Sequence, residues 1–414
     1  MKKQLISWFL LIAIVLSFTG CAAESTDPTL STEVPKENAL TMDLLSALER
    51  QPVESQAPDR ELADPMGAFA LALLQNSHVP GENTVLSPYS LYLSLAMTAN
   101  GAQGRTLEQI EGLLGMAVGE LNPYMLSFNC AQGSEVADAN SLWLHNELPV
   151  AETYLQTLRN YFEAQTYTTP FDSETMDAMN QWIEEQTAGR ITQAVDQMDP
   201  NAMMYLINAL TFDGKWNTPY TTNDLTQQSF LAPSGERTVE MMGSEESYYL
   251  SCGRGTGFMK DYEGDRYSFF ALLPNEGLAL EDYLASLTHE ELLNALEAPQ
   301  VTAVLATMPK LKLDTTVEMK EILASMGMTE AFTMNADFSG IEPTKSLYIS
   351  RILHKTYLQV DEVGTQAGAA TVTEFATKGV NLQQKTVFLN RPYVMGIYDK
   401  TNHCLLFLGT VSEP

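Results

Sequence analysis

Capping residues and apolar stretches in the first half of the chain predict helices. Ser87 and Pro88 precede an apolar stretch that ends before Gly101. A serine can cap a helix, proline is tolerated at the first helical position, and glycine is a favourable stop. A helix is therefore predicted to follow Ser87. A second capped helix is predicted over residues 172–190, whose apolar residues share one side.

Strand patterns dominate the later part of the chain. Residues 203–212 form a nearly continuous apolar run of strand length, which predicts a central strand covered on both faces. Asn208 lies inside this run, and a buried amide needs partners, so we expect a hydrogen-bonded cluster there. A hairpin is predicted about residues 233–235, and two apolar strands are joined at 399–402. Helices early and strands late predict one mixed α+β domain.

One stretch near the C-terminus fits neither a loop nor a core strand. Residues 360–379 read VDEVGTQAGAATVTEFATKG, and the part from 363 to 373 has no charge, no proline and little bulk. Solvated loops are usually marked by Pro, Asn, Asp and charge. The alternation of Thr and Ala residues is compatible with a strand, but such small side chains contribute little to burial.

Charge and motifs exclude several classes of function. The net charge of −29 with no basic cluster argues against nucleic acid and against an anionic membrane surface as partners. The sequence has no GxSxG, HExxH, phosphate-binding or dinucleotide-binding motif, and its five histidines are scattered. A hydrolase with an unrecognised site stays a remote alternative. Cys130, Cys252 and Cys404 lack metal-ligand spacing and are interpreted as small buried residues.

The N-terminus resembles a targeting segment. Two lysines precede an apolar stretch over residues 5–18, which predicts a signal peptide over residues 1–20. The small residues that end at Cys21 resemble a bacterial lipobox, so we expect a lipidated Cys21, with plain secretion as the alternative. Residues 21–61 are rich in Ser, Thr, Pro and acids and are predicted to be a disordered tether. The globular domain is predicted over residues 62–414.

Six ordered blocks of the sequence resemble the signature blocks of the serpins. They are NTVLSPYSLYLSLAMTANGAQGRT, YLINALTFDGKW, MPKLKL, ADFSGI, ISRILHKTYLQVDEVGTQAGAAT and FLNRPYVMGIYD. The resemblance covers residues 62–414 and implies three β-sheets with eight or nine helices and an exposed reactive-centre loop. It further implies an inhibitor of serine proteases, with cysteine proteases as further targets, which is a suicide substrate and no enzyme.

The stretch described above is similar to the serpin hinge. In the family's inhibitors the protease cleaves the reactive loop, here about residues 360–389, and the cleaved loop inserts into the central sheet. Insertion needs small side chains and a backbone N–H at every position, and no proline occurs between Pro343 and Pro392. Because non-inhibitory serpins tend to carry charged or bulky hinge residues, this hinge indicates an inhibitor. The matching residues are Glu362, Gly364, Thr365, Ala367, Gly368, Ala369 and Ala370.

Other positions match family features one by one. The family's shutter, a hydrogen-bonded cluster where the strands of the central sheet part, is matched by Ser87, Ser90, Asn208 and His354. Trp216 matches the tryptophan of the breach, where the hinge first enters. The family spacing from Glu362 places the cleaved bond between Lys378 and Gly379, which favours trypsin-like proteases. The loop is a few residues longer than usual, so the alternative reactive residues are Phe375, Thr377 and Leu382.

The same resemblance sets expectations about partners and location. The region between Ile110 and Asn140 is shorter than in animal serpins, so with the acidic composition no heparin-type or other cofactor is expected. We expect a monomer at the bacterial cell surface or secreted, attached to a membrane only through a lipid anchor. The alternative is a non-inhibitory serpin that acts as a binding or structural module at the cell surface.

Overall fold

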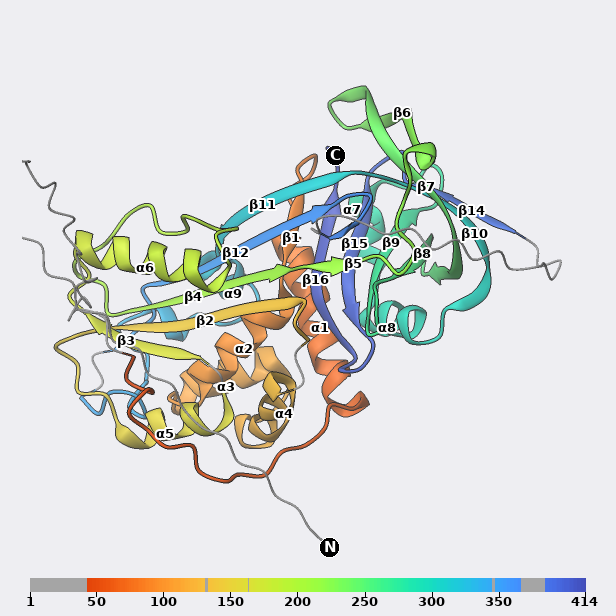
Figure 1. Cartoon of the computed structure of the whole chain (residues 1–414). Coiled ribbons are helices and arrows are strands. Elements are labelled where there is room, and N and C mark those ends of the chain that lie inside the picture. The colour runs from red at the N-terminus through yellow and green to blue at the C-terminus, as the bar shows by residue number, and fades with distance from the viewer. Residues whose placement is uncertain (1–42, 131–132, 163, 345–346, 366–383) are drawn as a thin grey trace, which may run out of the picture. The chain divides into compact units, whose positions relative to one another are not determined.

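The computed structural model describes residues 43–130, 133–162, 164–344, 347–365 and 384–414 (Figure 1). Residues 40–414 form one compact unit. Nine α-helices and two short 3-10 helices occur in the described residues. The helices are α1 (Arg60–Ser77), α2 (Pro88–Ala99), α3 (Gly104–Leu114), α4 (Val118–Cys130), α5 (Glu152–Tyr161), α6 (Ser173–Gln186), α7 (Leu280–Ser286), α8 (His289–Glu297), α9 (Lys320–Ser325), η1 (Thr222–Asp224) and η2 (Glu330–Phe332).

A seven-stranded sheet contains the central strand predicted above. Strands β4 and β12 are parallel neighbours, β2 is antiparallel to β4, and β11 pairs antiparallel with the other side of β12. The two-residue strand β13 lies between β12 and β5. The strands are β2 (Val136–His145), β3 (Gln165–Thr169), β4 (Met204–Phe212), β5 (Gly214–Lys215), β11 (Leu311–Glu318), β12 (Arg351–Val360) and β13 (Gly364–Thr365).

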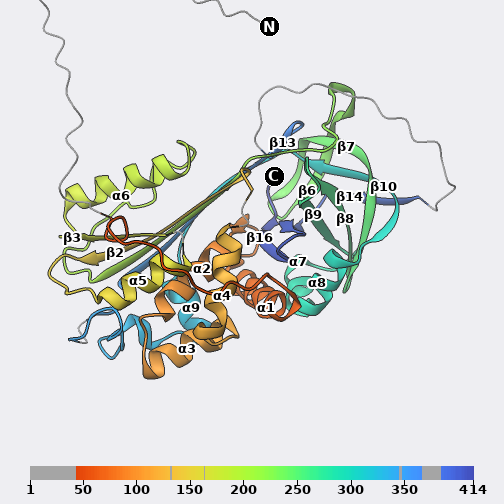
Figure 2. The ribbon, with the colours of Figure 1, turned by 60° about the horizontal axis from the view of Figure 1, so that its bottom comes forward.

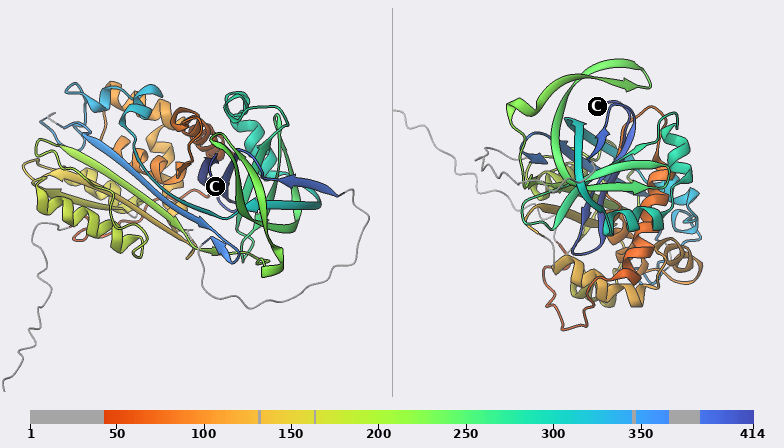
Figure 3. Two further views of the ribbon diagram at one scale, coloured as in Figure 1. Left: turned by 90° about the horizontal axis from the view of Figure 1, so that it is seen from above. Right: turned by 90° about the vertical axis from the view of Figure 1, so that its right-hand side faces the viewer.

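The remaining strands form a nine-stranded sheet. The 18-residue β7 pairs with β6 and β10 along most of its length and with β8 at its end. The strands of the other two sheets that the resemblance implies are thereby joined in one sheet. Strand β14 lies at the edge of this sheet, beside β10 (Figure 3). The strands are β1 (Thr84–Leu86), β6 (Leu225–Ala232), β7 (Gly235–Cys252), β8 (Gly255–Asp261), β9 (Tyr267–Pro274), β10 (Gln300–Pro309), β14 (Lys385–Phe388), β15 (Tyr393–Asp399) and β16 (Cys404–Val411).

Helices cover both faces of the seven-stranded sheet. Figure 2 shows α6 on one face and α2 on the other. Trp143, Trp182, Tyr205 and Leu353 belong to the apolar cluster on the α6 face. All twelve residues of α2 are buried, and the helix contacts both this sheet and β16. The larger apolar core therefore lies on the α2 face.

The predicted caps, central strand and hairpins are confirmed. The Ser87 side chain accepts a hydrogen bond from the backbone N–H of Ser90, and α2 begins at Pro88. Asp172 caps α6 in the same way. Every residue of β4 is buried, as its apolar sequence predicts. The C-terminal hairpin joins β15 and β16 around residues 400–403.

Residues 43–59 differ from the prediction of a disordered tether. Leu45 is buried with 1% exposure, and Asp43 Oδ1 accepts a 3.0 Å hydrogen bond from the backbone N–H of Thr166. Arg159 Nε donates to the carbonyl oxygen of Leu48 at 2.9 Å. One buried leucine and specific hydrogen bonds thus hold a segment whose composition is typical of disorder. Among the described helices, none is both long and apolar enough to cross a bilayer.

Candidate functional site: the hinge, breach and shutter of the seven-stranded sheet

The first hinge residues already form a strand in the sheet. Thr365 is opposite Val360 of β12 on one side and Gly214 of β5 on the other, and Gly364 is opposite Lys215. The Thr365 side chain is fully buried. Strand β13 therefore lies between β12 and β5, whereas further down β12 pairs directly with β4, the strand that precedes β5 in the chain.

Gly364 leaves no room for a side chain. A Cβ at this position would lie 2.1 Å from the carbonyl oxygen of Gly214 and 2.8 Å from the Cα of Lys215. Contacts this short do not occur between real atoms, so any other residue would push β13 away from β5. The glycine here is required by close backbone approach rather than by an unusual φ.

The carboxylate of Glu362 is held at the edge of the sheet. Lys310 Nζ lies 2.9 Å from Glu362 Oε2 and 3.0 Å from Glu240 Oε1. The residue's own backbone N–H and Lys310 hold the pKa of Glu362 below its usual value, against the effect of burial. The carbonyl oxygen of Glu362 accepts a 2.8 Å hydrogen bond from the N–H of Tyr220. Sequence reasoning found Glu362 but not Lys310, which precedes β11, far away in the chain.

Trp216 lies directly against the hinge. Its indole Nε1 donates a 2.8 Å hydrogen bond to the carbonyl oxygen of Asp361. Its ring stacks on Tyr262 with centroids 4.4 Å apart, and the Tyr262 hydroxyl lies 2.5 Å from Thr365 Oγ1. The buried ammonium of Lys260 lies 5.4 Å from the Trp216 ring centroid. The rings of Trp216 and Tyr262 and the ammonium group of Lys260 thus pack together where the hinge enters the sheet.

The four shutter residues come together between α2 and the sheet. Asn208 of β4 and His354 of β12 are direct neighbours across the parallel ladder. His354 Nε2 accepts a 2.9 Å hydrogen bond from the backbone N–H of Ser87. Burial lowers the pKa of His354 to about 3, so its ring is neutral at physiological pH. Because Nε2 accepts a hydrogen bond, the ring proton is on Nδ1.

Two residues of β2 complete this cluster, and the resemblance did not indicate them. Asn140 Oδ1 accepts from Asn208 Nδ2 at 2.8 Å and from Ser90 Oγ at 3.2 Å. Asp138 Oδ1 accepts from Ser90 Oγ at 2.9 Å and from Asn140 Nδ2 at 2.8 Å. Burial raises the pKa of Asp138 to about 7, against the effect of these hydrogen bonds. The alternating polar residues of the segment DANS were the available signal.

Two buried polar atoms of opposite residues at the boundary between β4 and β12 have no partner among the described residues. They are Asn208 Oδ1, an acceptor, and His354 Nδ1, a donor. A buried donor or acceptor without a partner costs about 1–3 kcal/mol. This boundary, which we call the seam, is therefore held by the ladder hydrogen bonds between the two strands while polar groups inside it stay unsatisfied.

Several residues of the sequence-based site lie outside the described residues. They include the lower hinge, the two residues of the candidate cleaved bond, the alternative reactive residues and the proposed lipidation site: Ala367, Gly368, Ala369, Ala370, Lys378, Gly379, Phe375, Thr377, Leu382 and Cys21. In the described part, no group of three or more His, Cys, Asp or Glu residues is arranged to hold a metal ion.

Comparison with known proteins identifies the family of this fold. The family model for serpins, described as serine protease inhibitors, matches residues 65–414. The chain belongs to the serpin family. The plasma serine protease inhibitor of Bos taurus is 30% identical over 81% of this chain and 86% of its own length. Serpins are mostly inhibitors of proteases and not catalysts.

Two solved structures of one thermophilic serpin, Tengpin, resemble this chain. Its native state is 35% identical, covers 91% of this chain and all of its own, and superposes with a TM-score of 0.86. Its latent state is also 35% identical, covers 87% of this chain and 99% of its own, and has a TM-score of 0.76. The serpin architecture expected from the sequence is therefore confirmed.

Proposed function

We propose that this serpin traps serine proteases by inserting its cleaved reactive loop, about residues 360–389, into the seam. The observation that carries this proposal is the position of β13. Its two residues already pair with both flanking strands, while β4 and β12 pair directly from Arg351 to Tyr357. An entering loop would continue a strand that the sheet has already begun.

The energetics favour insertion once the loop is free. A strand between β4 and β12 replaces one ladder by two, and a net hydrogen bond contributes about 1 kcal/mol. A dozen residues would then contribute on the order of 10 kcal/mol, which is comparable to the whole stability of a domain. The residues of the lower hinge are small enough to pass between the strands.

The trapping reaction requires a covalent intermediate. The protease serine Oγ attacks the carbonyl carbon of Lys378, and the bond from that carbon to the nitrogen of Gly379 breaks. The Gly379 nitrogen takes up a proton and leaves as the new N-terminus of the released fragment. The ester between Lys378 and the serine survives because insertion of residues 366–378 pulls the protease away and distorts its active site. Phe375, Thr377 or Leu382 in place of Lys378 would direct the reaction to other proteases.

Known relatives support this proposal. The bovine relative is named a plasma serine protease inhibitor, and Tengpin has been solved in a native and in a latent state. A relative that adopts both a native and a latent state is consistent with a fold whose native state is metastable. From Gly364 to Ala370 the hinge of this chain also has none of the charged or bulky residues that are typical of non-inhibitory serpins.

The test is to mix the protein with trypsin, chymotrypsin and elastase in separate reactions. Denaturing gels would detect the covalent complex, and mass spectrometry of the released C-terminal peptide would identify the cleaved bond. We expect an SDS-resistant complex with trypsin and a peptide that begins at Gly379. A first residue after Phe375, Thr377 or Leu382 would correct the assignment of the bond.

Cleavage without a complex by all three proteases would contradict trapping of these targets. A melting curve of the cleaved protein would then decide between two cases. A sharp rise in melting temperature would show that the loop inserts, so the target is another serine or cysteine protease. An unchanged melting temperature would favour the alternative, a non-inhibitory surface module.

We further propose that residues 1–20 are a signal peptide and that Cys21 becomes lipidated, which would place a monomeric domain at a bacterial cell surface. The support is the apolar stretch before Cys21 and the acidic surface, which has no affinity of its own for anionic lipid. Metabolic labelling with a radioactive fatty acid would test it. Label in the wild type and none in Cys21→Ser is expected, and an unlabelled protein in the culture medium would show plain secretion.

A further inference from the structure

A polar cavity of about 480 Å³ lies beside the shutter, at the start of β3, which is the edge strand of the seven-stranded sheet. Strand β3 begins at Gln165 and first pairs with Ser141 of β2. In the described part of the sheet, residues 138–140 therefore have a neighbouring strand only on the β4 side. These three residues and Gln165 line the cavity, so it lies in this gap. Its volume is within the range of pockets that hold small molecules.

The charged side chains around this cavity balance one another. Asp43 and Arg50 come from the segment before α1, Asp138 comes from β2, and Arg159 comes from the end of α5. Two carboxyl groups and two guanidinium groups thus surround one space. With Asp138 ionised, the four charges sum to zero. Electrostatic complementarity then favours a ligand that carries both signs and no net charge.

The two arginines are held in place by main-chain atoms. Arg159 Nε donates a 2.9 Å hydrogen bond to the carbonyl oxygen of Leu48, and Arg50 Nε donates a 3.1 Å hydrogen bond to the carbonyl oxygen of Arg159. Neither bond uses the terminal nitrogens of the guanidinium group. Arg159 has no acidic partner among the described residues. A guanidinium group fixed in this way can bind a carboxylate through two parallel hydrogen bonds.

One oxygen of the Asp138 carboxyl is available to a ligand. Asp138 Oδ1 accepts the hydrogen bonds from Ser90 and Asn140, whereas Oδ2 accepts none from the described residues. Among the same residues, Asp138 forms no ion pair with either arginine of the cavity, so a space separates the two signs of charge. A partly buried carboxylate is stabilised by a cationic partner, and an ammonium group donates hydrogen bonds to it.

Trp182 of α6 supplies an apolar surface in the cavity. Its indole Nε1 donates a hydrogen bond to Gln165, and its ring lies edge-on to that of Trp143, with centroids 6.4 Å apart. These two contacts fix the plane of the ring. An apolar side chain of a ligand could pack on this surface and be removed from water.

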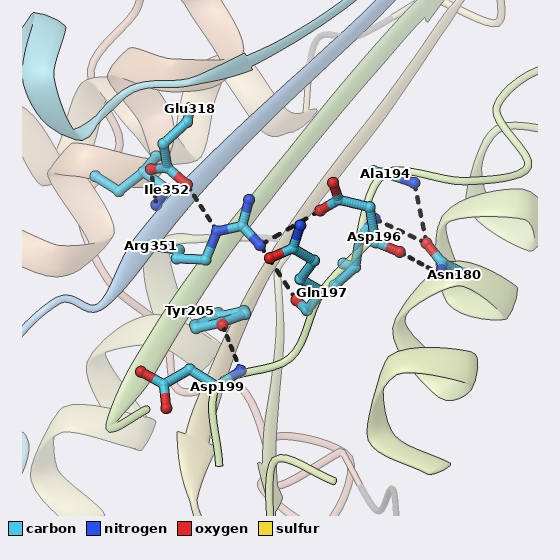
Figure 4. A network of polar contacts seen from close by, with 10 residues as sticks. Asn180, Ala194, Asp196, Gln197, Asp199, Tyr205, Glu318, Arg351 and Ile352 are labelled. Carbon is cyan, nitrogen blue, oxygen red and sulfur yellow. Dashed lines mark hydrogen bonds and ion pairs between the residues drawn. The ribbon is translucent and has the colours of Figure 1, made fainter. Parts of the chain in front are cut away.

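Helix α6 is itself fixed on the sheet, so the wall that contains Trp182 is preformed (Figure 4). Asn180 Oδ1 accepts a 2.9 Å hydrogen bond from the backbone N–H of Ala194, in the connection that follows α6. In the same connection, Asp196 Oδ1 lies 3.7 Å from the guanidinium group of Arg351 on β12. A preformed wall lowers the ordering cost of binding.

We propose that this cavity binds one small zwitterion, either a free amino acid or a dipeptide. The guanidinium groups of Arg50 and Arg159 bind its carboxylate, Asp138 Oδ2 binds its ammonium group, and its side chain lies against Trp182. Such molecules carry both charges and an apolar group within the size of the cavity, and they are end products of proteolysis. The inference goes beyond protease trapping and does not depend on it.

The experiment titrates the purified protein with four probes by calorimetry. Free leucine and the dipeptide leucyl-leucine are the two zwitterions, N-acetylleucine lacks the ammonium group, and leucinamide lacks the carboxylate. At about pH 7.5 the Asp138 carboxyl and the amino group of the zwitterions are mostly charged. We expect one binding site and affinities at least about tenfold lower for the two blocked probes. The tighter of the two zwitterions identifies the source of the ligand.

A zwitterion that binds the folded chain should also stabilise it. At about a hundred times its dissociation constant, we expect it to raise the melting temperature by about 3 °C. Asp138→Asn should abolish the preference for leucine over N-acetylleucine, and Arg159→Gln should abolish the preference for leucine over leucinamide. A purely structural role of these residues would not change those two ratios separately. The control is Arg105→Gln, which removes an exposed guanidinium group on α3 and should leave all four affinities unchanged.

Three results would overturn the assignment. The first is no binding of leucine or leucyl-leucine at about 10 mM, which would exclude a zwitterion site of even weak affinity. The second is equal binding of the blocked probes, which would show that the charges of the cavity do not select the ligand. The third is an equal loss of affinity in Arg105→Gln, which would show a general effect of protein charge. If Arg159→Gln does not fold, the four probes on the wild type and on Asp138→Asn still decide the question.

Discussion

The indole of Trp216 and the main chain of Asp361 are joined by a 2.8 Å hydrogen bond, so the breach holds the hinge by its backbone. This contact involves the carbonyl oxygen of Asp361 and not its side chain. Asp361 Oδ1 in turn accepts from the N–H groups of Val363 and Gly364 and shapes the turn that leads into β13. The entry point is therefore preorganised before any cleavage.

Trp216→Phe should loosen the hinge without emptying the core. Phenylalanine can still stack on Tyr262 but cannot donate to Asp361, which removes about 1 kcal/mol and about 2 °C of melting temperature. Hydrogen exchange should become faster at the amides of residues 361–365. The control is Trp182→Phe on α6, which loses an indole hydrogen bond to Gln165. Equal exchange at the hinge in both variants would contradict this role of Trp216.

If the chain traps proteases as proposed, Gly364→Ala should shift the reaction from trapping toward simple cleavage. The added Cβ would collide with the carbonyl oxygen of Gly214, so β13 could not pair with β5 and insertion would begin more slowly. Deacylation then competes better with trapping, and the ratio of cleaved free inhibitor to complex should rise several-fold on denaturing gels. Gly112→Ala is the control, because a Cβ there meets open space on α3. An unchanged ratio in Gly364→Ala would show that this ladder does not limit insertion.

Asp138→Asn should stabilise the intact protein above neutral pH. The pKa of this carboxyl is raised from 3.8 to about 7 by burial, so its ionisation costs stability as the pH rises through about 7. An asparagine Oδ1 can accept the same two hydrogen bonds from Ser90 and Asn140 without a charge. Because the pKa of this carboxyl in the unfolded chain is near 3.8, the loss develops from about pH 4 to about pH 7. We expect a melting temperature about 2 °C higher than wild type at pH 8.5 and equal values below about pH 4.

Other charged groups line the cavity that Asp138 faces, and they are the same in the wild type and in Asp138→Asn. Asp43, Arg50 and Arg159 line the cavity of about 480 Å³ that Asp138 also faces. His354 acts in the opposite direction, because a pKa lowered to about 3 makes stability fall as the pH falls below 6.5. Both proteins contain His354, so its effect cancels in the comparison. A constant difference between them at all pH values would rule out titration of Asp138.

Thr371→Val should weaken the inserted state more than the intact one. If the loop inserts and continues the register of β13, residue 371 would lie between His354 and Asn208, six residues from Val360 and Gly214, and its hydroxyl would meet the two unpartnered shutter atoms. A hydroxyl can donate to Asn208 Oδ1 and accept from His354 Nδ1. Without it we expect the cleaved form to melt about 2–4 °C lower and the intact form to be unchanged.

Thr371→Ser is the matched control, since it keeps the hydroxyl and removes only a methyl group. It should retain most of the stability of the cleaved wild type. If valine and serine have the same effect, the shutter atoms are satisfied in another way and the register is not supported by this residue.

Local patterns and the family resemblance were sufficient to predict much of the fold and part of the site. Ser87 and Pro88 specify the start of α2 through a cap and a fixed φ, and the apolar sequence of β4 specifies a buried strand. The resemblance named Trp216, which the structure places against the hinge strand, and the four shutter residues, which it brings together further down between α2 and the β4–β12 ladder. These features depend on neighbours in the sequence or on ordered motifs, which are readable without coordinates.

Tertiary structure alone decided the partners of those residues. Lys310 meets Glu362, Asp138 and Asn140 join the shutter, and Arg351 of β12 binds Glu318 of β11, because strands far apart in the chain become neighbours in one sheet. Residues 43–59 bind to the domain through one buried leucine and a few hydrogen bonds, which leave no periodic signal. By itself the sequence determined which segments are helices, strands and a small-residue hinge. Pairing between distant segments depends on register, and only the folded sheet shows that register.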